Sequence, residues 1–197
     1  MPILYILGGA NGVGKSTWYS TGMKNGYVNP TLPFLNSDNI QKELGGFTPE
    51  NAMLAEEMLK NLLKEVISRK ENFMIESNLA RMADYEWINR IRKEGYQTSL
   101  FFFGTDDVRV NKGRVLQRVK EGGHGVPEPI IEHRYRMGLS YLKREMLLLD
   151  DVILIDATGS YPMVEASVVA RKIMAKKSMA PHWVDEVLFL VERLQRK

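Results

Sequence analysis

Hydrophobic and polar residues divide the chain into short apolar runs and longer segments of helical periodicity. The apolar runs predict buried strands, and the segments between them predict helices. Strands are expected at residues 3–7, 32–36, 72–75, 98–103 and 152–155. Because strands and helices alternate, the pattern predicts an α/β fold of three layers, a parallel five-stranded sheet with helices on both faces.

Helices are expected at residues 16–24, 37–44, 49–67, 82–94, 106–120, 127–148, 161–175 and 181–194. Thr48 and Thr105 are suited to cap the helices that follow them, and Gly95 is suited to end the helix before it. In the 49–67 helix and in the last helix, the apolar residues recur on one face, so both helices are expected to pack on the body of the protein.

Composition adds only broad limits. The chain of 197 residues is expected to form one domain, residues 1–197. Its 27 basic and 24 acidic residues give a net charge of +3, which is weak evidence for a nucleic-acid partner. The lack of cysteine excludes disulfides and cysteine metal sites. No signal-peptide pattern or run of transmembrane length is visible, so we expect a cytoplasmic protein without a membrane partner.

The clearest chemical signal is the stretch Gly-Ala-Asn-Gly-Val-Gly-Lys-Ser-Thr at residues 9–17, which fits the P-loop pattern G-x-x-x-x-G-K-[ST]. It stands between a predicted strand and a predicted helix, an order that argues against a chance glycine-rich turn. We expect Lys15 to reach the β- and γ-phosphates of ATP, and Ser16 to hold Mg²⁺. The expected nucleotide-binding residues are Asn11, Gly12, Val13, Gly14, Lys15, Ser16 and Thr17.

Other P-loop classes fit the chain less well than a small kinase does. A transporter-type ATPase would need a signature loop and an apolar strand ending in Asp-Glu, and neither is present. A GTPase would need Asn-Lys-x-Asp, whereas residues 111–114 read Asn-Lys-Gly-Arg. Residues 156–159 match D-x-x-G, but they follow the last predicted strand, so we interpret this match as chance. The interpretation that remains is a small-molecule kinase.

Two carboxylates follow neighbouring strands. Asp38 comes just after the second predicted strand, and Glu76 ends the third. In a parallel sheet the ligand lies beyond the carboxyl ends of the strands, so both side chains should approach the phosphates. We expect Asp38 to act as the base that takes the acceptor's proton, and Glu76 to contact the acceptor or Mg²⁺. The alternatives are a helix cap for Asp38 and a cap or a surface turn for Glu76.

A basic segment at residues 114–136 surrounds a loop rich in glycine and proline, which is typical of a lid. Guanidinium groups stabilise the charge that develops on a transferred phosphoryl group. We expect Arg118 and Arg134 to have this role, and interpret Arg114 and Arg136 as parts of a solvated helix face. His124, in the loop, is either a phosphate contact or incidental.

Together these motifs resemble the zeta toxin family of P-loop kinases, in particular its compact bacterial branch, also labelled predicted ATPases. The matching stretches are residues 8–17, Asn-Ser-Asp at 36–38, Glu-Ser-Asn-Leu-Ala-Arg at 76–81, and residues 118–128 with their Gly-Gly-His-Gly-Val-Pro-Glu loop, continuing to Arg134-Tyr135. They keep the family's order over roughly residues 1–160, and the lid loop is the most specific of them.

The resemblance implies a kinase that phosphorylates the 3′-hydroxyl of a UDP-linked N-acetyl amino sugar and is restrained by a small antitoxin protein. It makes Asp38 the base, Arg118 the first γ-phosphate arginine, and Glu76, Asn78 and Arg81 the acceptor-binding residues. His124 stands about where the family has its second lid arginine, so either His124 or Arg134 takes over that role. The segment from Glu76 to Arg81 is one residue shorter than in close relatives.

Three other functions stay open. The first is a kinase for another small hydroxyl compound, such as a sugar acid or an antibiotic. The second is a non-catalytic ATP-binding module that a protein partner recognises. A nucleic-acid kinase is less favoured, because the basic residues cluster at the lid and no aromatic stacking platform is apparent.

Overall fold

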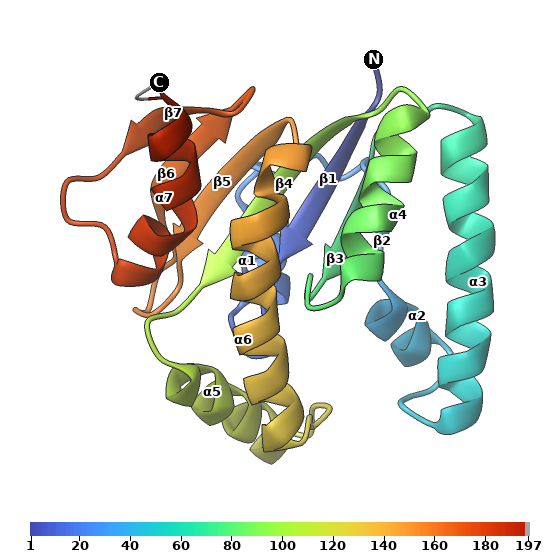
Figure 1. Cartoon of the computed structure of the whole chain (residues 1–197). Coiled ribbons are helices and arrows are strands. Elements are labelled where there is room, and N and C mark those ends of the chain that lie inside the picture. Colours follow the sequence, from blue (N-terminus) through green and yellow to red (C-terminus); the bar gives the residue numbers. More distant parts are fainter. Residues whose placement is uncertain (196–197) are drawn as a thin grey trace.

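The computed structural model describes residues 1–195, which are built around one seven-stranded sheet (Figure 1). The strand order is β2-β3-β1-β4-β5-β6-β7; the first five strands are parallel, and the last two extend the β5 edge antiparallel. The strands are β1 (Ile3–Gly8), β2 (Phe34–Leu35), β3 (Phe73–Ser77), β4 (Gln97–Gly104), β5 (Asp151–Asp156), β6 (Met163–Val169) and β7 (Lys172–Lys176).

Helices cover both faces of this sheet, so the predicted α/β architecture is confirmed (Figure 1). The helices are α1 (Lys15–Lys24), α2 (Ser37–Glu43), α3 (Pro49–Ser68), α4 (Met82–Lys93), α5 (Val108–Lys120), α6 (Glu128–Glu145), the short 3₁₀ helix η1 (Met146–Leu148) and α7 (His182–Gln195). No helix within residues 1–195 is long and apolar enough to span a membrane.

Two apolar cores lie on the two faces of the sheet, because successive residues of a strand point to opposite sides. In β1, Leu4 and Ile6 belong to the core that includes side chains from α3, α4, α6 and α7. Leu7 belongs to the other core, where Trp18 of α1 packs edge-on against Phe103 of β4 at 5.5 Å between ring centroids. The carboxyl ends of the parallel strands are therefore fixed from both sides.

The prediction of five strands was wrong, because the predicted helix at residues 161–175 is instead the hairpin of β6 and β7. Ala170 and Arg171 form its two-residue turn with φ angles of 47° and 65°. Such turns normally contain Asn or Gly, which adopt positive φ easily, so the sequence carries no turn signal here. The helix predicted at 181–194 is present as α7.

Helix ends agree with the sequence in part. Thr48 caps α3 as predicted, since its side chain accepts a hydrogen bond from the Asn51 N–H at 3.1 Å. The cap of α5 is Asp107, which accepts from the Arg109 N–H, so the prediction of Thr105 was wrong. The Thr105 hydroxyl instead donates to Asn111 Oδ1 at 2.6 Å and links β4 to α5.

The apolar face of α3 docks less completely than predicted. Ala55 and Val66 are buried, whereas the side chains of Met58 and Leu62 are 42% and 36% exposed. Leu59 is partly buried against the main core. The helix therefore stands at the border of the fold, and a space remains between it and α4.

Gly104, the last residue of β4, leaves room for the ring of Trp183 from α7: a Cβ atom there would lie 2.6 Å from the ring. We expect Gly104→Ala to lower the free energy of unfolding by about 1–3 kcal/mol, because an overpacked core costs about this amount. Urea unfolding measures the effect. Gly113→Ala in α5 is the control, because nothing lies within 4 Å of its added Cβ. Wild-type stability in Gly104→Ala would contradict this account of the packing.

Candidate active site

The P-loop connects β1 to α1 in a conformation that needs its glycines. Gly9, Gly12 and Gly14 all have positive φ, between 76° and 129°. A Cβ atom on Gly12 would lie 2.3 Å from the backbone oxygen of Asn111, so α5 packs directly on the loop. The loop thus has the backbone freedom and the close support that a phosphate cradle requires.

Asn111 holds the same loop through its side chain. It is fully buried, and its amide donates to the Asn11 backbone oxygen at 2.8 Å while its oxygen accepts from Thr105. This residue cannot be predicted from the sequence, because an asparagine inside a helix carries no pattern that reveals a partner 100 residues away. Asn111 and Thr105 position the P-loop and do not line either cavity of the site described below.

Lys15 is buried at the start of α1. Its Nζ donates to the backbone oxygens of Gly9 (2.6 Å) and Ala10 (3.2 Å) and lies 3.5 Å from a Glu76 carboxylate oxygen. Burial lowers the pKa of Lys15, and the neighbouring Glu76 partly opposes that shift. The ammonium group is therefore held by the loop and by one carboxylate.

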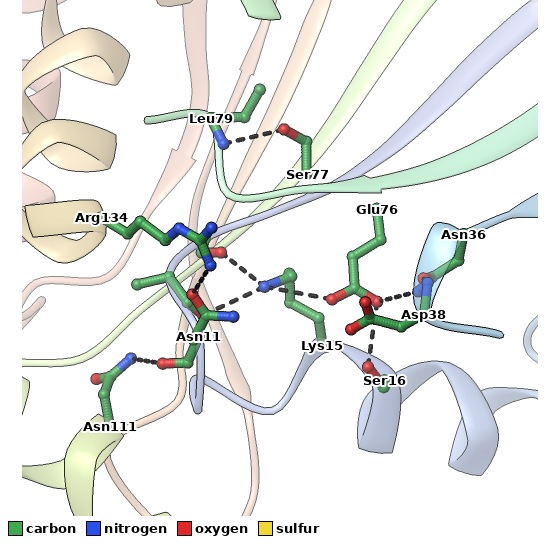
Figure 2. Close-up of polar contacts among 12 residues, drawn as sticks. Asn11, Lys15, Ser16, Asn36, Asp38, Glu76, Ser77, Leu79, Asn111 and Arg134 are labelled. Atoms are coloured by element: carbon green, nitrogen blue, oxygen red, sulfur yellow. Dashed lines mark hydrogen bonds and ion pairs between the residues drawn. The ribbon is translucent and has the colours of Figure 1, made fainter. Parts of the chain in front are cut away.

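Glu76, at the end of β3, joins three segments at the centre of the site (Figure 2). Besides facing Lys15, its Oε2 accepts from the Ser16 hydroxyl (3.1 Å) and from the Asn36 amide (2.8 Å). Asp38 lies beside it in the first turn of α2, and its side chain points toward the same space (Figure 2). Asn36 caps α2 by accepting from the Asp38 N–H at 2.7 Å, so the Asp38 carboxylate is not the cap.

The oxygen atoms of this cluster suit a hard cation. Mg²⁺ prefers oxygen ligands and is usually bound by one or two carboxylates together with phosphate oxygens and water. Ser16 and Glu76 supply a hydroxyl and a carboxylate 3.1 Å apart. Residues 1–195 contain no group of three His, Cys, Asp or Glu side chains arranged for a metal. Ser16 and Glu76 could supply part of the coordination of Mg²⁺, with phosphate oxygens and water as the other ligands.

Two cavities meet at this cluster. The smaller, about 340 Å³, lies along the P-loop and α5, and the larger, about 550 Å³, extends between α3 and α4. Asn11, Asp38 and Glu76 line both of them. The site is thus two compartments with a common wall of one amide and two carboxylates.

The predicted site residues divide between the compartments. The smaller cavity is lined by Gly12, Gly14, Lys15, Ser16, Thr17 and Arg118, and the larger by Asn78, Arg81 and Arg134. The Val13 side chain points away into the core beneath β1. His124 lines neither cavity; its ring stacks on Phe47 of the α2–α3 loop with centroids 4.5 Å apart.

The two predicted lid arginines reach the site from different helices. Arg118 of α5 lines the smaller cavity, and its buried Nε has no hydrogen-bond partner in the described chain. Arg134 of α6 donates to the Asn11 side-chain oxygen at 2.7 Å (Figure 2). Lys112 ties the two helices together by pairing with Glu128 at 3.0 Å. The lid segment is therefore docked on the P-loop in this structure.

Arg114 is not part of a solvated helix face, so that interpretation was wrong. Its guanidinium donates to the backbone oxygens of Ala157 (2.7 Å) and Gly159 (2.8 Å), in the loop after β5. It also lines the smaller cavity. Arg114 therefore fixes the β5–β6 loop beside the P-loop. Its partners are backbone carbonyl groups, which no pattern of residue types predicts.

The sequence matches one protein-family model. The model of the family described as "AAA domain" (AAA_33) covers residues 4–137, which include the P-loop, both carboxylates and the lid. The chain belongs to this AAA-domain family.

Other proteins resemble this AAA-domain protein at low identity. An uncharacterized protein of Haemophilus influenzae (strain ATCC 51907 / DSM 11121 / KW20 / Rd) is 28% identical over 131 residues, which cover 64% of this chain and 88% of the relative. A structure of the AvrRxo1-ORF1:-ORF2 complex has a TM-score of 0.68 and 15% identity over 90% of this chain, which spans 62% of that protein. A structure of the PezAT chromosomal toxin–antitoxin system of Streptococcus pneumoniae has a TM-score of 0.61 and 17% identity, covering 100% of this chain and 86% of that one.

At such identities the structural likeness shows the fold alone. The AAA-domain protein has a P-loop kinase-like α/β fold with a mostly parallel sheet. The P-loop lies within the residues that the family model matches, at the carboxyl end of β1, which is flanked by β3 and β4.

Proposed function

We propose that this AAA-domain protein is an ATP-dependent kinase that moves the γ-phosphoryl group of ATP to a hydroxyl of a small molecule. The observation that carries the proposal is the common wall of the two cavities, formed by Asn11, Asp38 and Glu76. One cavity contains the P-loop, and the other has the volume of a second substrate site. A hydroxyl in the larger cavity could therefore approach the end of a triphosphate bound in the smaller one.

The side chains around the wall have complementary roles in this proposal. Lys15 and the P-loop N–H groups bind the phosphates, and Asp38 takes the proton of the hydroxyl as its oxygen attacks the γ-phosphorus and ADP leaves. Arg118 stabilises the transferred group, assisted by Arg134, which lines the larger cavity and contacts Asn11, whereas His124 lines neither cavity. Ser16 and Glu76 would hold Mg²⁺, which supplies charge neutralisation on the phosphates.

For the acceptor we propose a UDP-N-acetyl amino sugar, with Glu76, Asn78 and Arg81 in contact with it. This rests on the resemblance to zeta toxins and is supported by the fold likeness to the PezAT toxin–antitoxin structure. A small antitoxin protein is the corresponding partner. ATP as the nucleotide is supported by the P-loop and by a structure of AvrRxo1-ORF1:-ORF2 with ATP, which has a TM-score of 0.66.

A product assay tests the proposal. The protein is incubated with ATP, Mg²⁺ and UDP-N-acetylglucosamine, and mass spectrometry looks for a sugar nucleotide heavier by one phosphate. We expect this product with the wild type and almost none with Asp38→Asn. ADP without the product would reject the amino sugar and favour another acceptor. Neither ADP nor product would favour a non-catalytic ATP-binding module.

A further inference from the structure

The larger cavity continues well beyond the carboxylates. Past Asn78 and Arg81 it runs between α3 and α4, where Leu59 and Leu63 of α3 face Trp87 of α4 across the space. The floor is apolar as well, being formed by Leu35, Ile75, Leu79 and Ile88. None of these side chains can take part in phosphoryl transfer, so they form a separate compartment that we name the α3–α4 cleft.

The α3–α4 cleft has a cationic rim. Arg90 lines it, is exposed, and forms no ion pair with any residue of the described chain. Arg81, the other cation at this level, is already paired with Asp84 at 2.8 Å. Arg90 is therefore the cation at the rim that can form an ion pair with a ligand.

The positions on α4 give the length of the cleft. Ala83, Trp87 and Arg90 line the cavity at a spacing of four and three residues, so they follow one stripe of the helix. The helix rises about 1.5 Å per residue, which places Arg90 about 10 Å further along the stripe than Ala83. Because α4 starts directly after the Glu76–Arg81 segment, this stripe leads away from Asp38.

From this arrangement we infer that the α3–α4 cleft binds the non-reacting part of the acceptor, and that this part combines a flat aromatic or unsaturated ring with an anionic group. The ring lies between Leu63 and Trp87, and the anion faces Arg90. The inference rests on the proposed kinase function. It selects elongated acceptors such as nucleotide sugars over small sugar acids, which would leave the apolar compartment empty.

A binding measurement tests the chemistry of the cleft without turnover. The probe is 1-anilinonaphthalene-8-sulfonate, which carries aromatic rings and one anionic group and fluoresces when bound. We expect the wild-type protein to bind it at one site, with about tenfold weaker binding in Trp87→Ala and Leu63→Asn, and a smaller loss in Arg90→Gln. UDP-N-acetylglucosamine should displace the probe, and free N-acetylglucosamine should not.

Matched variants separate the cleft from other apolar surface. Leu62→Asn and Lys93→Gln change exposed residues of the same two helices that do not line the cavity, so both should bind the probe like the wild type. Thermal unfolding should be unchanged in Arg90→Gln, Leu62→Asn and Lys93→Gln, and the unfolding temperature should fall in Trp87→Ala and Leu63→Asn, because both side chains pack against the core. ATP affinity should be unchanged in all five variants, which checks that each one is folded at the measuring temperature. Equal probe binding by Trp87→Ala, Leu63→Asn and wild type would overturn the inference.

Kinetics distinguish this inference from the proposed function. If phosphoryl transfer occurs, Trp87→Ala should raise the KM for UDP-N-acetylglucosamine about tenfold, and Arg90→Gln should raise it severalfold. In both variants, kcat and the KM for ATP should stay within about a factor of two of the wild-type values. Unchanged acceptor KM values in an active enzyme would reject the cleft as the acceptor site. Specific probe binding without transfer to any acceptor and without formation of ADP would reject the kinase function and leave the α3–α4 cleft as a binding site.

Discussion

Replacing Asp38 by Asn is expected to lower kcat for phosphoryl transfer by about 10²–10⁴, the usual size of a general-base effect. The exposed Asp38 carboxylate stands in the wall that both cavities share, where an acceptor hydroxyl would meet the γ-phosphate. The amide of Asn has the same shape and cannot take up the proton. Because Asn36 and not Asp38 caps α2, the variant should fold normally.

The measurement is steady-state formation of phosphorylated acceptor, accompanied by an ATP-binding titration. ATP affinity should change little, since Lys15 and the loop N–H groups remain. Glu43→Gln is the matched control: it removes an exposed carboxylate from the same helix, lines neither cavity, and should leave kcat unchanged. A kcat within about a factor of two of wild type in Asp38→Asn would remove Asp38 from the role of base.

Replacing Arg118 by Ala is expected to lower kcat by about 10³ or more, because guanidinium groups that contact a transferred phosphoryl group have effects of this size. Arg118 reaches the smaller cavity from α5, and its buried Nε has no partner in the part of the chain that the structure describes. The loop shapes this position, since a Cβ on Gly123 would lie 2.6 Å from the Arg118 side chain. An unpartnered buried donor beside a phosphate site is suited to bind an anion.

Single-turnover kinetics with bound ATP would show the loss in the chemical step. Arg118→Lys keeps the charge but not the planar pair of donors, so it should recover only a small part of the activity. The control is Arg136→Ala, an exposed arginine of α6 that lines neither cavity. If Arg118→Ala turned over like Arg136→Ala, Arg118 would lose this role and the stabilisation of the transferred group would fall to Arg134.

Local signals in the sequence were sufficient for most of the fold. The β1–loop–α1 order, the Thr48 cap and the alternation of strands and helices depend on neighbouring residues, and each is present in the structure. The β6–β7 hairpin was missed because Ala170 and Arg171 occupy a turn conformation that these residue types rarely adopt. In this segment the pairing of β6 with β5 determines the strand conformation, and local propensity does not.

For the site, strand-end reasoning brought Asp38 and Glu76 together correctly, because parallel topology fixes where strands end. It could not find Arg114, whose partners are backbone oxygens of a loop more than 40 residues away. It also missed Trp87, because an aromatic residue at helical spacing suggests the core of a protein. Only the position of α3 relative to α4 makes Trp87 part of a cavity wall.

The position of β1 between two later strands has a consequence for the protein while it is being made. β1 pairs with β3 and β4, so the strand that carries the P-loop leaves the ribosome long before its neighbours at residues 73–77 and 97–104. The loop also needs Asn111, further along the chain. A nascent chain that ends before α5 therefore contains the whole nucleotide motif without the Asn111 contact that holds the loop, and we expect ATP to stabilise the protein only after α5 has been synthesised.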